Sequence, residues 1–173
     1  MIAMKLVRLI ETHHEELAHT LMRKVEECSK CADLKKLVPR QELETRYQEV
    51  YRHMSDWLVT KTEHDIFSSY TALGRHRFEQ GVPFHQFLWG IELVKENLWD
   101  FLEREAVDIN PVNLQSEFDL LRSLGQFFDK ALYYAALGYW EAHDFAEREK
   151  KDVVRAGRPP AKKRRTRTAP CPH

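Results

Sequence analysis

Apolar residues recur at every third or fourth position between residues 84 and 102, and this spacing constrains the fold more than any other feature. It places them on one face of an α-helix about five turns long. The residues are Phe84, Phe87, Leu88, Ile91, Val94, Leu98, Phe101 and Leu102. Gly81 and Pro83 come just before them; glycine is common after the end of a helix, and proline in the first turn of the next. The segment therefore predicts two consecutive helices separated near Gly81.

The same spacing recurs along most of the chain. It predicts five helices, over about residues 2–28, 39–58, 63–80, 83–106 and 111–153. Helix breakers are few, with only six glycines and seven prolines among 173 residues. Each predicted helix has one apolar stripe and one charged face, so each must bury its stripe against the others. We therefore expect an all-α protein, either a five-helix bundle or a globin-like helical pack.

The charges are divided unevenly along the chain, although 27 basic residues balance 27 acidic ones. Residues 155–173 contain no Asp or Glu, and their basic residues are Arg155, Arg158, Lys162, Lys163, Arg164, Arg165 and Arg167. Residues 1–154 keep 20 basic residues against 27 acidic ones, so the two parts carry about −7 and +7. Because the last segment has few apolar residues to bury, the sequence predicts a helical domain over 1–154 and a disordered basic tail over 155–173.

The tail suggests contact with a polyanion. Gly157, Arg158 and Pro159 resemble the core of an AT-hook, in which arginines enter the minor groove of AT-rich DNA, although Ala156 occupies a position where that motif has arginine. A run of seven positive charges would bind DNA, RNA or an acidic protein face by releasing counterions. The alternative is a solvated extension without a function.

Four residues could form a Cys3His zinc site if the tail folded back. They are Cys28, Cys31, Cys171 and His173. The Cys-x-x-Cys pair is only half of such a site, and it lies near the end of a predicted helix, where the helix dipole opposes a thiolate. Two unrelated thiols are the alternative, and we expect no metal and no cofactor.

The histidines do not predict a metal or haem centre either. The Glu-x-x-His pairs at 11–14 and 16–19 lie on one predicted helix, whereas a di-iron site needs such motifs on facing helices. His76 and His85 are candidate haem ligands in a globin-like pack, but the simpler interpretation is that both lie on the surface. His13 falls on an apolar stripe and is expected to be a hydrogen-bonded core residue. No residues form a recognisable catalytic constellation.

Arg77 is expected to be partly buried beside Tyr70 and Phe78. A buried guanidinium must be paired, and Glu92 and Asp129 are the predicted partners. The interpretation is a structural polar cluster where helices meet.

Two segments carry a family resemblance. Residues 72–102 and the stretch FFDKALYYAALGYWEA at 127–142 resemble the N-terminal domain of RsbT co-antagonist proteins, the RsbRD N-terminal domain. Weaker similarity extends to LIETHHEELAHTLMRK and YTALG, so that the resemblance covers most of residues 5–148.

The resemblance implies a helical, non-haem, globin-like sensory domain of stressosome proteins and some sensor kinases, often dimeric, which modulates an attached output module. No STAS or kinase module follows in this chain, so we expect the tail or a separate signalling partner to supply the output. The resemblance adds no catalytic residues.

Exposed aromatic residues are predicted to form the dimer or partner surface, because aromatics often anchor interfaces. The candidates are Trp89, Trp99, Tyr133, Tyr134 and Trp140. The alternative for each of them is a place in the core.

The leading interpretation is a non-enzymatic sensory or regulatory domain that acts through protein–protein contacts in bacterial stress or signal transduction, as a homodimer. The alternative is a small DNA-associated protein in which a helical dimer presents the basic tail. A third interpretation is a metal or redox enzyme, which purified protein would reveal by bound metal or haem. We expect a cytoplasmic protein without a membrane span, because no uncharged run approaches the roughly 18 residues that cross a bilayer.

Overall fold

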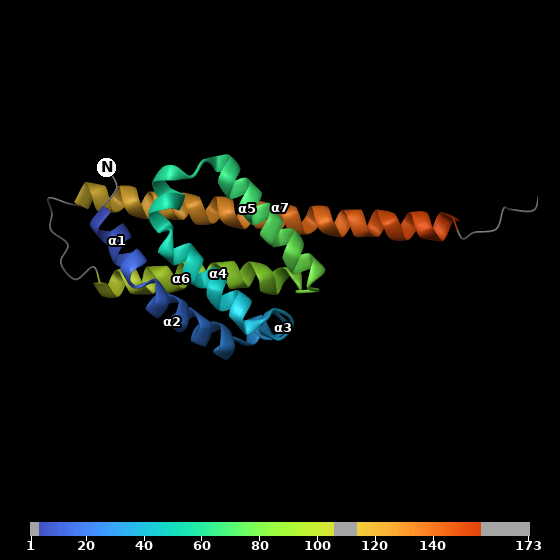
Figure 1. Ribbon diagram of the computed structural model, residues 1–173, viewed down its shortest axis with the longest axis horizontal. Coiled ribbons are helices and arrows are strands. Elements are labelled where there is room, and N and C mark those ends of the chain that lie inside the picture. Colours follow the sequence, from blue (N-terminus) through green and yellow to red (C-terminus); the bar gives the residue numbers. More distant parts are fainter. Residues whose placement is uncertain (1–3, 106–113, 157–173) are drawn as a thin grey trace, which may run out of the picture.

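The computed structural model describes residues 4–105 and 114–156, and every regular element within these ranges is helical (Figure 1). The prediction of an all-α protein is therefore confirmed. The elements, with a 3₁₀ helix η1 and a π-helix η2, are α1 (Met4–Thr12), α2 (His14–Glu27), η1 (Ser29–Cys31), α3 (Ala32–Leu37), α4 (Arg40–Arg52), η2 (Asp56–Thr60), α5 (Glu63–Glu79), α6 (Phe84–Glu105) and α7 (Leu114–Ala156). Residues 1–3, 106–113 and 157–173 lie outside the described part.

The helix predicted over residues 2–28 is divided at His13 into α1 and α2. Two successive side chains hydrogen-bond to carbonyl groups of the preceding turn. The Thr12 hydroxyl donates to the Arg8 carbonyl at 2.8 Å, and Nδ1 of His13 lies 2.9 Å from the Leu9 carbonyl oxygen. Such bonds compete with the backbone ladder and bend helices. The His13 ring is half-buried against Phe101, in agreement with the expected core histidine.

The helix predicted over residues 39–58 ends early, at Arg52. The chain turns at His53. Two residues later, the amide and hydroxyl of Ser55 both donate to Oε1 of Glu11, at 2.8 and 2.5 Å. A π-helix follows, η2, a geometry that is rare and is often found at functional sites. The short link between the first two predicted helices forms η1 and α3.

The turn between α5 and α6 matches its sequence signal. Gly81 has a φ of +75°, which residues with a Cβ rarely adopt. The amide of Gly81 donates to the Phe78 carbonyl, and the amide of Val82 donates to the Arg77 carbonyl. This is the Schellman pattern that ends many helices, so α5 ends where Gly81 predicts.

The helices α5 and α7 form the most extensive helix pair in the described part. Two glycines let their backbones touch. A Cβ on Gly74 would lie 2.0 Å from the Ala135 carbonyl oxygen, and a Cβ on Gly138 would lie 2.0 Å from the Thr71 carbonyl oxygen. No larger residue fits at either position without moving a helix.

A buried hydrogen-bond network joins α2, α4 and α6. The Asn97 side-chain amide donates to the Leu17 carbonyl and to the Tyr51 hydroxyl, at 3.0 and 3.2 Å. The Tyr51 hydroxyl donates to the Val94 carbonyl at 2.9 Å. Asn97 and Tyr51 are fully enclosed, so these bonds satisfy polar groups that would otherwise destabilise the core.

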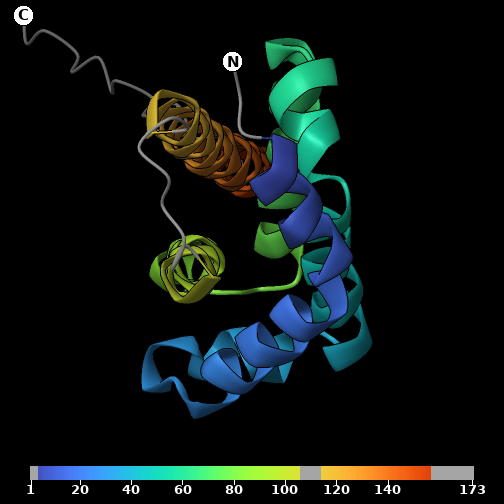
Figure 2. The ribbon, with the colours of Figure 1, turned by 90° about the vertical axis from the view of Figure 1, so that its left-hand side faces the viewer.

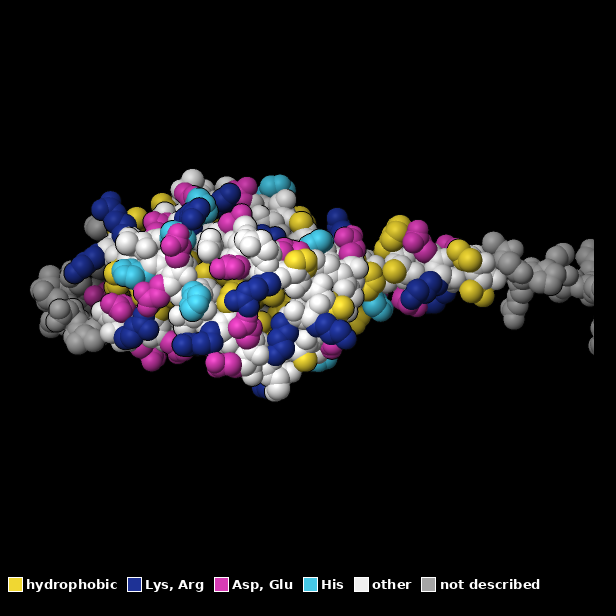
Figure 3. Space-filling view, turned by 60° about the horizontal axis from the view of Figure 1, so that its bottom comes forward, with side chains coloured by type: hydrophobic (Ala, Val, Ile, Leu, Met, Phe, Trp, Pro, Cys, Tyr) yellow, Lys and Arg dark blue, Asp and Glu magenta, His cyan; other side chains and the backbone are white. Residues whose placement is uncertain are grey.

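Figure 2 shows α6 and α7 nearly end-on, beside a curved wall formed by α1, α2, α4 and α5. The helix α7 is 43 residues long, or about 64 Å at 1.5 Å per residue. Only part of that length lies against the other helices. The C-terminal part projects beyond them as a single helix (Figures 1 and 3).

Candidate functional site

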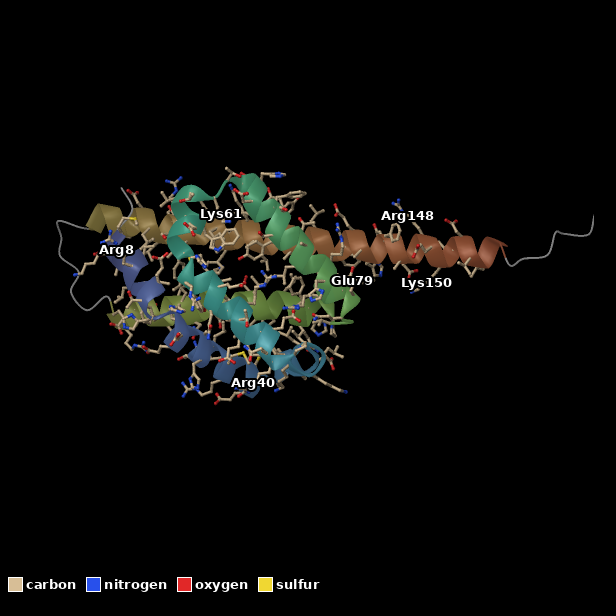
Figure 4. All side chains as sticks on the ribbon, in the orientation of Figure 1. Arg8, Arg40, Lys61, Glu79, Arg148 and Lys150 are labelled. Carbon is tan, nitrogen blue, oxygen red and sulfur yellow. The ribbon has the colours of Figure 1, made fainter. Side chains whose placement is uncertain are left out.

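The projection of α7 begins where α5 ends. Residues at the end of α5 and on α7 line an open groove of about 550 Å³ at this point. The groove is lined by Arg75, Phe78, Glu79, Glu141, Ala142, Phe145 and Ala146. Figure 4 shows Glu79 at the end of α5, and Arg148 and Lys150 on the projecting part of α7. From there α7 continues to Ala156, and we call residues 141–156 its free end.

One face of α7 is buried against the other helices, which together form the body of the domain. Its residues include Leu124, Ala131 and Ala135, each fully enclosed, and Gly138 in contact with α5. These positions repeat at intervals of three, four and seven residues, as expected for one face of a helix. This face is what holds α7 to the body.

The same face continues along α7, first beside the groove at the end of α5 and then beyond it. Phe145 is 64% exposed and Val153 is 72% exposed, although both lie in helical phase with the buried residues. Glu149 lies on the same side of the helix, between Ala146 and Val153. The exposed apolar side chains on either side of it favour a contact that covers them. We call this set the free-end stripe, and it consists of Ala142, Phe145, Ala146 and Val153.

Charged residues flank the free-end stripe in two blocks of opposite sign. Residues 141–147 contain three acidic residues and no Lys or Arg. Residues 148–155 contain four basic residues, Arg148, Lys150, Lys151 and Arg155, against two acidic ones. The Glu147 carboxylate accepts a hydrogen bond from Lys150 at 3.0 Å, an exposed pair that adds little to stability.

The five aromatic residues predicted as a partner surface do not share one exposed patch. Tyr133 and Trp140 are exposed on α7, whereas Trp89, Trp99 and Tyr134 are half-buried against the core. The Tyr134 hydroxyl donates to Glu63 at 2.7 Å, and the Lys30 ammonium lies 3.8 Å from the centre of the Trp89 ring. Their role as a partner surface stays a prediction.

Sequence reasoning missed Phe145 and Val153. Their phase relative to Leu124 and Ala135 was a usable signal, because the buried face of α7 can be extended along the sequence at helical spacing. The spacing alone does not predict where along α7 the cover by α5 ends.

The Cys-x-x-Cys pair lies in the turn between α2 and α3. Cys31 is fully buried, and burial together with the neighbouring Cys28 thiol raises the pKa of Cys31 to about 12, so it stays a thiol at neutral pH. Among residues 4–105 and 114–156, no three His, Cys, Asp or Glu side chains gather as metal ligands. Cys171 and His173 lie outside the described residues, and His76 and His85 are exposed.

Most of the predicted polyanion-binding tail also lies outside the described residues. This applies to Arg158, Lys162, Lys163, Arg164, Arg165 and Arg167. Arg155 belongs to the last turn of α7, because the helix continues to Ala156 instead of ending at the predicted boundary after residue 154. Disorder of the tail and its binding to nucleic acid stay predictions.

Arg77 is buried as predicted, with 3% of its surface exposed, but the predicted partners are wrong. Its Nη1 donates to the Glu42 carboxylate and, at 2.6 Å, to the side-chain oxygen of Gln80. Glu92 and Asp129 instead lie near Lys95, at 3.6 and 4.0 Å. The carboxylate comes from α4, where Glu42 lies thirty-five residues earlier in the chain.

These contacts favour the ionised form of the Glu42 carboxylate. Burial by itself would raise the pKa of Glu42, but hydrogen bonds from Arg77 and Gln80 and the positive charge of Arg77 outweigh it and leave that pKa below its ordinary value. The ion pair therefore ties α4 to α5 as long as Glu42 is ionised.

Comparison with protein families decides the identity of the domain. The model of the RsbT co-antagonist protein rsbRD N-terminal domain matches residues 11–154. The chain belongs to this family. No curated protein and no solved structure matches it. This match confirms the resemblance seen at residues 72–102 and 127–142. The family consists of regulatory domains of bacterial stress signalling. Among the described helices of this RsbRD N-terminal domain, none is both long and apolar enough to span a membrane.

Proposed function

We propose that this RsbRD N-terminal domain is a non-enzymatic regulator that acts through protein–protein contacts, and that its free-end stripe binds a second copy of the chain. The observation that carries the proposal is the exposure of Phe145 and Val153 in helical phase with the buried face of α7. A face of this kind is stable in water when another helix covers it.

The charges beside the stripe favour a second copy as the occupant. In an antiparallel pair of free ends, the acidic residues 141–147 of one chain would lie beside the basic residues 148–155 of the other. The contact would be self-complementary, as in most homodimers. Hydrophobic and charged side chains lie side by side along the projecting helix in Figure 3, as such an interface requires.

A dimer formed in this way would leave the outer side of α7 free. Tyr133 and Trp140 lie there, exposed, on the part of the helix that is packed against the body. We propose that these aromatic residues contact the signalling partner that supplies the output module. Aromatic anchors of this kind contribute much of the affinity in many interfaces.

The test replaces the stripe without disturbing the body. The double substitution Phe145→Ser and Val153→Ser removes the two largest exposed residues of the stripe, and each apolar side chain is worth about 1.5–3 kcal/mol when buried. We expect the dimer dissociation constant to rise more than about 100-fold, with helix content unchanged. Size-exclusion chromatography with light scattering across a concentration series measures the fractions of monomer and dimer.

Val154 provides a matched control. It is as exposed as Val153, at 71%, but it lies on another side of the helix, one residue further along. Val154→Ser should leave the dimer intact. Equal weakening by Val153→Ser and Val154→Ser would refute the stripe as the interface, as would a dimer that survives the double substitution.

A further inference from the structure

The Cys-x-x-Cys pair spans the turn between α2 and α3 (Figure 1). The amide of Cys31 donates to the Cys28 carbonyl at 3.2 Å, which closes the 3₁₀ helix η1. A 3₁₀ helix rises about 2.0 Å per residue with three residues per turn, so the two Cα atoms are expected about 6 Å apart on one side of the turn. A disulfide bond requires Cα atoms about 4.4–6.8 Å apart, so the backbone of this turn can accept one.

The two thiols already contact each other. The Cys31 thiol hydrogen-bonds with the Cys28 thiol, and both cysteines are free. Cys31 is fully enclosed, whereas Cys28 is half-buried and keeps part of its surface exposed. Burial is the main cause of the raised pKa of Cys31, so Cys31 does not act as the first nucleophile. A dissolved reagent therefore reaches Cys28 first, and Cys31 reacts only through Cys28.

Residues of α6 hold this turn in place. The side-chain oxygen of Gln86 accepts from the amides of Asp33 and Leu34, at 2.7 and 3.2 Å, and its nitrogen donates to the Asp33 carboxylate at 2.9 Å. The Lys30 ammonium lies 3.8 Å from the centre of the Trp89 ring. Gln86 is 8% exposed, so its hydrogen bonds are shielded from water. The turn is therefore ordered before any reaction, and joining the two sulfurs requires little further ordering of the chain.

We propose that Cys28 and Cys31 form a reversible disulfide bond in the presence of a small-molecule disulfide, and that this turn is an oxidation-sensitive site of the domain. The Cys28 thiolate attacks one sulfur of the small disulfide and expels the other half as a thiolate. The Cys31 sulfur then attacks the Cys28 sulfur and expels the second half, while the Cys31 proton passes to solvent. The protein loses two hydrogen atoms, and the small disulfide is reduced to two thiols.

This site is separate from the free-end stripe, which lies on α7. Oxidation can therefore be measured whether or not the chain dimerises through that stripe. The new bond would rigidify a turn that packs against α6, so oxidising conditions would change the domain at this point. The third cysteine of the chain, Cys171, is replaced by serine in every protein tested, so that only this pair can react.

The experiment treats the folded full chain carrying Cys171→Ser with excess glutathione disulfide and measures the mass of the intact protein and of its peptides. We expect the loss of two hydrogen atoms, located at Cys28 and Cys31, and its reversal by dithiothreitol. In Cys31→Ala the reaction should stop at the mixed disulfide, so Cys28 should gain one glutathione. In Cys28→Ala the buried Cys31 should react at least about tenfold more slowly than Cys28 does in Cys31→Ala.

Three results would overturn the proposal: an unchanged mass, a disulfide between two chains, or one glutathione on each of the two cysteines. A bond that forms only after unfolding in urea would also contradict it, because the folded turn would then not hold the two sulfurs together. If either alanine variant fails to fold, the protein carrying only Cys171→Ser still decides, since the loss of two hydrogen atoms and an unchanged mass are opposite outcomes.

Discussion

Gly138→Ala is expected to destabilise the protein by about 2–4 kcal/mol, although alanine is the better helix former. The added Cβ would lie 2.0 Å from the Thr71 carbonyl oxygen and 2.7 Å from two further Thr71 backbone atoms. Backbone atoms cannot rotate away as a side chain does, so α5 and α7 must separate. Gly74→Ala should behave alike, because its Cβ would lie 2.0 Å from the Ala135 carbonyl oxygen.

Gly125→Ala separates this clash from the ordinary effect of replacing glycine in a helix. Gly125 lies on the same helix, and a Cβ there would have nothing within 4 Å. Alanine should therefore stabilise the protein by about 0.5–1 kcal/mol at this position. Urea unfolding followed by circular dichroism measures all three variants. If Gly138→Ala proved as stable as Gly125→Ala, the close packing of α5 on α7 would be wrong.

Glu42→Gln is expected to lower the free energy of unfolding by about 2–3 kcal/mol. The substitution leaves the buried Arg77 guanidinium without a carboxylate, and an uncompensated buried charge typically costs about 3–5 kcal/mol. The effect should lie below that range, because Glu42 is about one-third exposed and Gln80 still accepts from Arg77. Glu49→Gln, an exposed carboxylate on the same helix without an ion pair in the described residues, should change stability by less than about 0.5 kcal/mol.

The same pair predicts a pH dependence with a definite sign. The pKa of Glu42 is lower in the folded protein than in the unfolded chain, so its contribution is complete above the unfolded value near 4.5. That contribution is lost as the pH falls through the folded pKa. The difference in stability between wild type and Glu42→Gln should therefore shrink below about pH 4.5, which unfolding curves from pH 7 to pH 3 measure. A difference that stays constant over this range would contradict the pair.

Periodicity predicted the helical elements because it depends on local geometry. The end of α5 at Gly81 follows from glycine at a positive φ, which the sequence marks directly. The break at His13 was missed, since it depends on which rotamers Thr12 and His13 adopt against the preceding carbonyls. Nothing in the spacing of apolar residues contains that information.

Contacts between residues far apart in the sequence were harder to predict. The burial of Arg77 could be predicted from its position on a helix face, but its partner could not, because Glu42 lies on a helix whose neighbours depend on the whole pack. The sequence predicts which face of each helix is apolar. Which other helix packs against that face depends on tertiary packing.

The proposed assembly is tested most directly by the mass of the full chain in solution. Sedimentation equilibrium across concentrations up to about 100 µM should give twice the monomer mass of 20.6 kDa, with the dimer lost in the Phe145→Ser and Val153→Ser double variant. A wild-type mass of 20.6 kDa over the whole concentration range would contradict the account, because the free-end stripe would then be exposed without a second copy to cover it.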